Sequence, residues 1–226
     1  MDGREPIGIS YTPSFCKNPA DEPEFNRWYK EVHFMDVRPI GVLQNPIMFH
    51  NARTPLPPGL DKFLIMYEVY HQDIAEGMRE FSQHTAKLRR DYDGTRGSRS
   101  ANRGIYRVLH REFVHQSHLR SQSFYAERVD CASPERLEEL RRFYLGDRLP
   151  ALLATGLFHT ASFGETIANN APPAESTGRT RFLALFESSS EDASGIASQI
   201  ADRFPRHALP PFVRVAEAVA AKRDSA

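Results

Sequence analysis

The chain has 226 residues, 40% of them hydrophobic, and its 29 basic and 29 acidic side chains give a formal net charge of zero. Without a basic excess we expect no nucleic acid or anionic membrane as a partner, and no apolar run approaches the roughly 20 residues that span a bilayer. The polar N-terminus resembles no targeting signal, so we expect a cytoplasmic protein. Cys16 and Cys131 lie in no CxxC spacing, so we expect no disulfide framework.

Two stretches of the chain resemble each other. Phe25–Leu43 (FNRWYKEVHFMDVRPIGVL) aligns without a gap on Leu140–Phe158 (LRRFYLGDRLPALLATGLF), at an offset of 143 − 28 = 115. Phe63–Val69 (FLIMYEV) aligns on Phe182–Ser188 (FLALFES), at an offset of 182 − 63 = 119. Because the two matches occur in the same order with nearly the same offset, they predict an internal duplication.

Each half shows the same order of hydrophobic patterns, namely strand, helix, strand, strand, helix and strand. In the first half the patterns lie at 5–11, 25–32, 41–51, 62–70, 74–81 and 105–114. In the second half they lie at 123–130, 137–144, 156–165, 181–188, 196–204 and 212–219. This β-α-β-β-α-β order predicts an α+β protein with two tandem ferredoxin-like repeats, 5–115 and 123–220. The arginine-rich stretch 89–104 and the stretch 169–181 are predicted to be loops.

The predicted strands are apolar on both faces. In Phe63–Val69, Phe63, Ile65 and Tyr67 alternate with Leu64 and Met66. A strand with two apolar faces needs cover on both, whereas the helices of one repeat cover a single face of its sheet. We therefore expect the two sheets to pack face to face as a closed or nearly closed barrel, with the helices outside and a lined cavity between the sheets.

The phrase EFNRWYKEVHFMDV…GVL, followed by FLIMYEV, resembles the dimeric α/β-barrel superfamily, and most of all its EthD-like and antibiotic-biosynthesis-monooxygenase-like branches. Members of these branches often place an acidic residue, a histidine, a proline and a glycine across this helix and turn. Glu31, His33, Pro39 and Gly41 occupy those places, while Phe34-Met35-Asp36 departs from the sequence that usually follows the histidine.

The resemblance implies that the tandem chain mimics the usual dimer, and it leaves open whether two such chains form a further homodimer. It also implies a range of activities: cofactor-free oxygenation of phenols, polyketide cyclisation, lactone isomerisation, decarboxylation and, in distant branches, haem chemistry. A fold by itself does not choose among these activities.

His33 and Asp36 form the first candidate catalytic pair. At 100° per residue, Asp36 falls on the apolar face of the helix with Trp28, and His33 falls at the edge of that face. A carboxylate three residues away can orient an imidazole and raise its basicity, which suits a general base. The second half has Arg148 and Ala151 at these positions, so the pair is not a requirement of the fold. The alternative is a helix-end histidine beside a solvated aspartate.

Further candidates lie on the predicted strands. Strand alternation places His50 on one side with Gln44 and Met48, and His159 aligns with Gln44 in the repeat. If that side faces the cavity, His50 and His159 approach each other across the barrel. His110 is a further candidate base. Candidate substrate contacts are Tyr11, Trp28, Gln44, Asn45, Met48, Tyr67 and Arg148. The alternatives are strand-edge positions for the histidines and core packing for the aromatic side chains.

The sequence contains no HExxH, HxH, GxGxxG, P-loop or GxSxG motif. We therefore expect neither a metal nor a cofactor. The predicted function is cofactor-independent acid–base chemistry (cyclisation, isomerisation, elimination or decarboxylation) on a small, hydrophobic, oxygenated substrate of aromatic or polyketide type, in secondary metabolism or aromatic catabolism. The alternatives are a cofactorless monooxygenase, a haem-binding two-repeat barrel and a non-catalytic ligand-binding module.

Overall fold

The structure is a computed structural model of the chain. It describes residue 2 and residues 4–16, 18–56, 61–88, 97–99, 104–114, 119–131, 133–167 and 181–224. Most of the arginine-rich loop 89–104 and of the loop 169–181 lies outside these residues. Among the described helices, none has the length and apolar character needed to cross a membrane.

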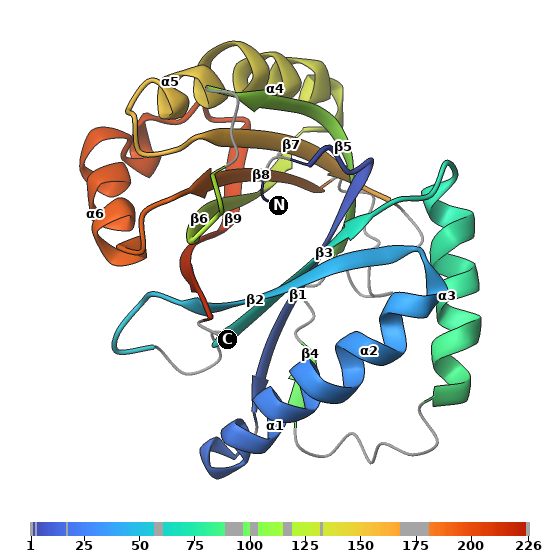
Figure 1. The fold of residues 1–226 in the computed structure, drawn as a ribbon. Coiled ribbons are helices and arrows are strands. Elements are labelled where there is room, and N and C mark those ends of the chain that lie inside the picture. The colour runs from blue at the N-terminus through green and yellow to red at the C-terminus, as the bar shows by residue number, and fades with distance from the viewer. Residues whose placement is uncertain are drawn as a thin grey trace.

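The two repeats follow each other along the chain (Figure 1). The first consists of β1 (Gly8–Cys16), α1 (Glu22–Trp28), α2 (Phe34–Val37), β2 (Leu43–Asn51), β3 (Phe63–Val69), α3 (Ile74–Leu88), β4 (Gly97–Arg99) and β5 (Gly104–Phe113). The second consists of β6 (Ser123–Cys131), α4 (Leu137–Phe143), α5 (Leu149–Leu153), β7 (Thr160–Thr166), β8 (Arg181–Ser188), α6 (Ala193–Arg203) and β9 (Val213–Arg223).

The strands of both repeats form one closed antiparallel barrel. Within the repeats the strand orders are β2-β3-β1-β5 and β9-β6-β8-β7, and the pairs β2–β9 and β5–β7 join them into a ring. The short strand β4 pairs with the far end of β1. Helices lie on the outside of both sheets (Figure 1). The predicted fold, two ferredoxin-like repeats packed sheet to sheet, is confirmed.

The inner faces of the two sheets pack directly on each other. Thirteen buried apolar side chains form this interior cluster: Ile9, Tyr11, Ile47, Phe49, Leu64, Met66, Tyr106, Phe124, Ala126, Leu183, Leu185, Val219 and Ala221. The space for which the sequence predicts a lined cavity therefore holds a packed cluster of aromatic and aliphatic side chains, as protein cores do.

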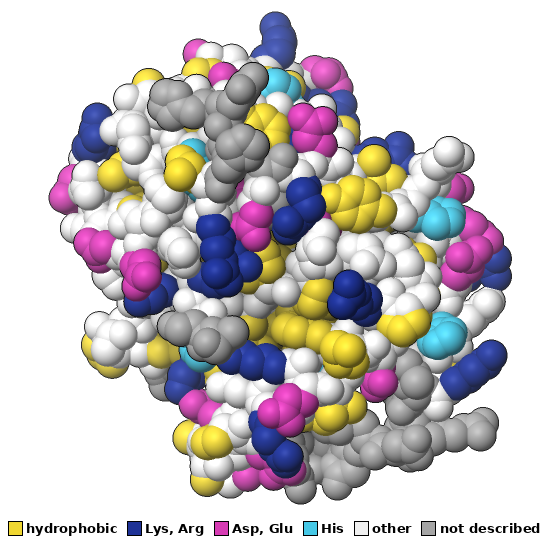
Figure 2. Space-filling model, in the orientation of Figure 1, with side chains coloured by type: hydrophobic (Ala, Val, Ile, Leu, Met, Phe, Trp, Pro, Cys, Tyr) yellow, Lys and Arg dark blue, Asp and Glu magenta, His cyan; other side chains and the backbone are white. Residues whose placement is uncertain are grey.

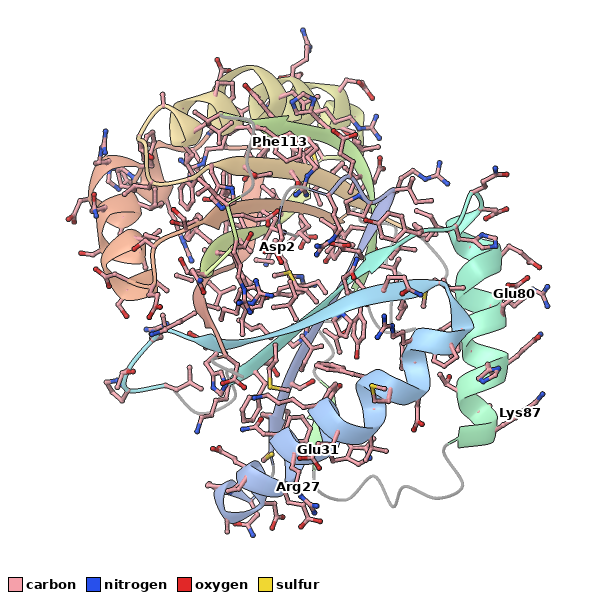
Figure 3. All side chains as sticks on the ribbon, viewed as in Figure 1. Asp2, Arg27, Glu31, Glu80, Lys87 and Phe113 are labelled. Carbon is pink, nitrogen blue, oxygen red and sulfur yellow. The ribbon has the colours of Figure 1, made fainter. Side chains whose placement is uncertain are left out.

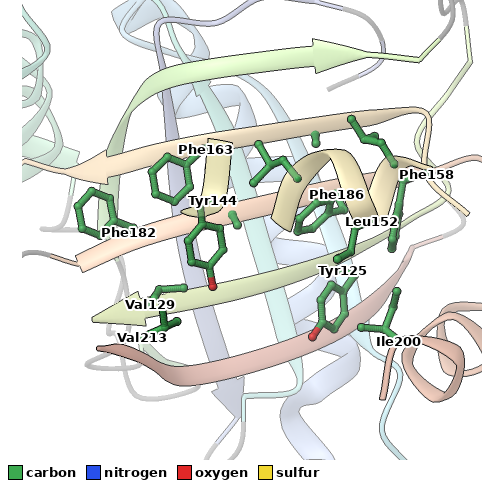
Figure 4. Packing of buried hydrophobic residues seen from close by; sticks show 14 of the residues in the cluster. Tyr125, Val129, Tyr144, Leu152, Phe158, Phe163, Phe182, Phe186, Ile200 and Val213 are labelled. Atoms are coloured by element: carbon green, nitrogen blue, oxygen red, sulfur yellow. The ribbon is translucent and has the colours of Figure 1, made fainter. Parts of the chain in front are cut away.

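A second kind of core lies between each sheet and its own helices. We call these the first-repeat layer, which includes Phe25, Tyr29, Val37, Phe63 and Tyr67, and the second-repeat layer, which includes Tyr125, Tyr144, Leu152, Phe163 and Phe186. Figure 4 shows the second-repeat layer, where tyrosine and phenylalanine rings fill the space beside the helices.

Both helical segments before the second strand of a repeat contain a π turn. The turns span Tyr29–His33 and Tyr144–Arg148, 115 residues apart. A π turn closes i→i+5 hydrogen bonds and so inserts one residue into the helix, which shifts the following side chains by about 100°. Asp36 is therefore exposed and Val37 is buried. The prediction that Asp36 lies on the apolar face is wrong for this reason, and Val32, 44% exposed, leaves that face as well.

Candidate functional site

The π turn of the first repeat gathers aromatic side chains around His33. Its ring stacks on Trp28, with 4.8 Å between ring centroids and 24° between planes, and meets the edge of Tyr29 at 4.8 Å. Trp28 and His33 are five residues apart, which would place them about 140° apart on a regular α-helix. The inserted residue brings them to one side, and His33 is half-buried there.

This aromatic group connects the helix to the sheet. Tyr29 packs against Phe34 with centroids 5.6 Å apart, and Phe34 meets the Tyr67 ring of β3 edge-on at 5.9 Å. Tyr67 is paired in the sheet with Ser10 of β1. His33, Trp28 and Tyr67, three candidates named from the sequence, are thus members of one continuous set of contacts.

Small hydroxyl side chains form the β1 wall of the first-repeat layer. Ser10, Thr12 and Ser14 lie opposite Tyr67, Ile65 and Phe63 on β3, and all three β3 side chains belong to this layer. The oxygens Ser10 Oγ and Thr12 Oγ1 are 3.4 Å apart.

Two of these hydroxyl residues have unusual surroundings. Ser14 is buried, and its Oγ has no hydrogen-bond partner among the described residues. Thr12 is partly exposed although it lies in the middle of a paired strand. Of the three hydroxyl side chains of the β1 wall, that of Thr12 is partly exposed, whereas those of Ser10 and Ser14 are buried.

The second repeat has larger side chains at the matching positions, and two of them are charged. Tyr125, Glu127 and Arg148 stand 115 residues after Ser10, Thr12 and His33. Glu127 is 1% exposed. It accepts hydrogen bonds from the hydroxyls of Tyr125 and Tyr144, each at 3.0 Å, and from Nε of Arg148 at 3.3 Å and its Nη2.

These contacts also shift the pKa values of the partners. Burial opposes the charge of Arg148, but hydrogen bonding to Glu127 raises its pKa. Burial and the negative charge of Glu127 together raise the pKa of Tyr125. The second-repeat layer is thus closed by a buried Glu127–Arg148 ion pair, in which both oxygens of the carboxylate are hydrogen-bonded. The prediction that Arg148 contacts a substrate gains no support, because its guanidinium is engaged with Glu127.

The histidines at 50 and 159 do not meet inside the barrel. On β2 it is Ile47 and Phe49 that point to the interior, so His50 is on the outer side, with its ring edge-on to Phe63 at 5.2 Å and Nε2 3.3 Å from Asp224 Oδ1. β9, β6 and β8 separate β2 from β7 in the ring. The condition for the predicted pair, that the His50 side faces the interior, is not met. Met48 shares that outer side and is buried in the first-repeat layer.

His159 lies at the start of β7, near one mouth of the barrel. Its Nδ1 is 2.8 Å from Thr160 Oγ1, and Nε2 has no hydrogen-bond partner among the described residues. Burial lowers the pKa of His159, and the negative charge of Glu187 opposes this shift. His110 instead lies partly exposed on β5, with Nε2 3.7 Å from Glu112 Oε2.

The two repeat-related glutamates, Glu68 and Glu187, lie at the same mouth of the barrel. Four antiparallel pairings separate β3 from β8, so the two strands run in the same direction. Arg4 Nε lies 2.9 and 2.8 Å from the Glu68 oxygens, and Arg111 Nη2 lies 2.8 Å from Glu187 Oε1. Each buried carboxylate therefore has its own arginine.

Several further polar groups at this mouth form hydrogen bonds. Asn45 donates to Glu68, and Gln44 donates to the backbone oxygen of Arg38 at 3.1 Å, which gives both predicted substrate contacts a structural role. Asp2, at the centre of the view in Figure 3, accepts from the Ser121 backbone N–H at 2.9 Å. Figure 2 shows the same face, where apolar side chains between the two halves are surrounded by Lys and Arg.

One charged group in the barrel interior was missed by the sequence analysis. Arg128 donates from Nε to the Tyr106 hydroxyl at 3.2 Å and forms an ion pair with Glu217 at 3.4 Å. Tyr11 is buried in the same interior, its hydroxyl has no hydrogen-bond partner among the described residues, and burial raises its pKa. The available signal was the charged pair Glu127-Arg128 in the middle of the predicted strand 123–130.

The described residues contain no group of three or more His, Cys, Asp or Glu side chains that could hold a metal ion. A haem needs an axial donor, most often an imidazole, beside a wide apolar slot. In the second-repeat layer the position of His33 is taken by Arg148, and stacked rings fill the adjoining space, with Phe163 5.1 Å from Tyr144 and 5.2 Å from Phe182. These residues do not fit a haem. In the first-repeat layer His33 is the imidazole that could serve as donor.

A comparison with protein families finds none that matches, and a comparison with curated proteins finds no match either. Several solved structures are similar. An anthrone oxidase-like protein superposes with a TM-score of 0.60 at 10% identity, covering 100% of this chain and 94% of the other. A mutant chlorite dismutase from Candidatus Nitrospira defluvii gives 0.55 at 9% identity, covering 98% and 93%. A dye-decolorizing peroxidase from Bacteroides thetaiotaomicron gives 0.53 at 8% identity, covering 99% and 94%.

These matches extend over nearly the whole length of both chains, so the two-repeat arrangement is common to all of them. At about one identical residue in ten they establish the fold, the ferredoxin-like α+β barrel. They do not transfer an activity, because one fold hosts many reactions.

Proposed function

We propose that this chain is a small-molecule enzyme that binds an oxygenated aromatic or polyketide-like substrate in the first-repeat layer, where His33 moves a proton to or from it. The observation that carries the proposal is the asymmetry of the two layers. The second is closed by Glu127 and Arg148, whereas the first has a half-buried imidazole, His33, at the position of Arg148 and the hydroxyl side chain of Thr12 at the position of Glu127. The similar structures are described as an oxidase-like protein, a dismutase and a peroxidase, which supports an enzyme on this fold.

The residues of the layer divide the work in this mechanism. Stacking on Trp28 holds the His33 ring in one orientation, and a positioned general base contributes about 10²–10⁴ in rate. Hydroxyl groups of Ser10 and Thr12 stabilise the enolate or phenolate oxygen that forms as the proton leaves. Removal of a proton begins both cyclisation or isomerisation and cofactorless oxygenation, so the same site suits the two reaction types.

Anthrone is a suitable probe, because its methylene protons are acidic and its deprotonated form is an aromatic anion of the phenolate type. Under nitrogen in heavy water, we expect the protein to accelerate exchange of these protons for deuterium, followed by NMR. His33→Gln should reduce the acceleration by about 10²–10⁴. Asp36→Asn, on the exposed side of the same helix, is the matched control and should leave it unchanged. Equal exchange rates for the wild type and His33→Gln would contradict the proposal.

Oxygen uptake separates the two reaction types. If the bound anion reacts with oxygen, one molecule of oxygen is consumed per anthrone, and anthraquinone and water are the products. Proton exchange without oxygen uptake favours an isomerase or cyclase, and binding without exchange favours a non-catalytic module.

Haem binding through His33 is the remaining alternative. It predicts a Soret band when haem is added to the wild type, and the loss of that band in His33→Gln. A spectrum identical to that of free haem in both proteins would remove this alternative.

A further inference from the structure

The two π turns are anchored by different contacts. In the second repeat, Arg148 at the end of the turn forms an ion pair with Glu127 on β6, within the second-repeat layer. The matching residues of the first repeat, 115 positions earlier, are His33 and Thr12. Because Thr12 carries no charge, the ion pair that anchors the second π turn cannot form at these positions in the first.

The first π turn is instead tied to the second repeat by a partly exposed ion pair. Lys30 lies within the turn, and its Nζ is 2.7 Å from Oδ2 of Asp224. Asp224 directly follows β9, the strand of the second repeat that closes the barrel against β2. The Asp224 side chain is 22% exposed and that of Lys30 is 35% exposed, so solvent and salt screen the pair only in part.

Two further contacts hold Asp224 in place. Its backbone N–H donates to the carbonyl oxygen of Met48 at 2.9 Å, which extends the pairing of β2 with β9 by one residue. Its second carboxylate oxygen, Oδ1, lies 3.3 Å from Nε2 of His50. The His50 ring packs edge-on against Phe63, and both Phe63 and Met48 belong to the first-repeat layer. Asp224 therefore connects the π turn to the strand β2.

The second repeat has leucines at both positions of this ion pair. The residue pairs that close the barrel follow the offset of 115 on both sides. This offset places Leu145 at the position of Lys30 and Leu109 at the position of Asp224. The second π turn is thus anchored from within its own layer, and the first from the neighbouring repeat. The last residue of the first turn can therefore be an imidazole, that of His33, in place of an anchoring arginine.

We infer that Asp224 is a positioning residue for His33. Its ion pair with Lys30 holds the π turn against β2, and the turn in turn holds the His33 ring against Trp28. His50, named from the sequence as a candidate base, contributes through its contact with the Asp224 carboxylate. This inference rests on the proposed function for the role of His33, and it adds a residue of the second repeat to the site of the first.

The expected effect of the ion pair is on the orientation of the imidazole. A partly exposed pair adds little to stability, whereas a displacement of about 1 Å in a reacting group can lower a rate about 10²-fold. Loss of the pair should therefore leave the urea unfolding midpoint nearly unchanged. It should alter the emission of Trp28, the only tryptophan of the chain, which stacks on His33, and the rate of anthrone proton exchange.

A double-mutant cycle with Lys30→Met and Asp224→Asn tests the inference, because these substitutions remove the two charges with little change in size. We expect each single variant to change the Trp28 emission in the same direction as His33→Gln and to lower the anthrone exchange rate about 10- to 100-fold. The double variant should be no worse than either single variant, because both remove the same contact. Single variants that behave as the wild type, or effects that multiply in the double variant, would overturn the inference.

Glu191→Gln is the matched control. Glu191 forms an ion pair with Lys222 of β9 at 2.7 Å, and both side chains are exposed. Its replacement should leave the Trp28 emission and the exchange rate as they are in the wild type. Changes as large as those of Asp224→Asn would show that any loosening of β9 affects the site, and the specific role of the contact with Lys30 would be wrong.

Failure of the inference and failure of the proposed function are distinguishable. If His33→Gln lowers the exchange rate but the Lys30 and Asp224 variants do not, the proposed function stands and the inference fails. If the wild type does not accelerate exchange, the proposed function fails, and the Trp28 emission of the four proteins in the cycle still decides whether Asp224 positions His33.

Discussion

The two repeats use one scaffold in different ways. They have the same strand order, the same π turn and the same glycine after the helical segment, yet their helix–sheet layers differ in chemistry. The second is sealed by Glu127 and Arg148, and the first has Thr12 and His33 at those positions. The comparison teaches that the two repeats share a backbone. Their chemistry differs because of a few side chains on the first strand and in the π turn of each repeat.

The largest expected effect comes from breaking the ion pair of the second repeat. Arg148→Ala leaves the buried Glu127 without its cation and should lower the free energy of unfolding by about 3–5 kcal/mol, measured by urea denaturation. His33→Ala, at the matching position of the first repeat, removes a half-buried side chain and should cost less than about 1 kcal/mol.

A double replacement serves as the control for this comparison. Glu127→Leu combined with Arg148→Met removes both charges and should be much less harmful than Arg148→Ala alone. If Arg148→Ala and His33→Ala destabilise the protein equally, the two layers do not differ in the way described.

Substitutions of the glycines after the helical segments test whether the two repeats share a backbone conformation. Gly41 and Gly156 adopt φ of 81° and 74°, a left-handed conformation that costs other residues about 1–2 kcal/mol. Gly41→Ala and Gly156→Ala should therefore lower the unfolding free energy by similar amounts within that range. Gly146, inside the π turn with open space around its Cβ position, is the control, since Gly146→Ala should be neutral or stabilising. Unequal costs at Gly41 and Gly156 would argue against a common scaffold.

His159 should make the stability depend on pH. Because burial lowers its pKa in the folded state, the unfolded chain binds more protons, and stability should fall as the pH decreases below the unfolded value of about 6.5. His159→Gln should reduce the slope of unfolding free energy against pH in this range. His110→Gln, at a partly exposed position, is the comparison, and an equal change in slope for the two variants would contradict the assignment.

The smallest effect on stability is expected at the stacked pair of the first repeat. His33→Gln removes the ring that contacts Trp28 and should change the tryptophan emission spectrum, while the unfolding free energy changes by less than about 1 kcal/mol. Asp36→Asn should leave the emission unchanged, because Asp36 is exposed. An emission change of equal size in Asp36→Asn would contradict the stacking.

The fold could be predicted because its signals are local and occur twice. The aligned blocks Phe25–Leu43 and Leu140–Phe158 revealed the duplication, and the two-faced apolar strand Phe63–Val69 required cover on both sides. The closed barrel with outer helices follows from these two facts. The candidates His33, Trp28 and Tyr67, which the structure joins in one set of ring contacts, also stand in the repeated blocks.

The arrangement of the site depended on features that a sequence pattern does not contain. A regular helix places Trp28 and His33 about 140° apart, and only the π turn stacks them and exposes Asp36. Alternation showed that His50 and Met48 share one side of β2, but not which side faces the interior.

By itself, the sequence determined the repeats, the order of their elements and the alternation of side chains along each strand. The tertiary structure decided which face of each strand became the barrel interior, because both faces are apolar and the choice depends on how the second sheet packs against the first. It also decided that Glu127 and Arg148 meet, since an ion pair between a strand and a helix 21 residues further along the chain forms only when the helix folds back on the sheet.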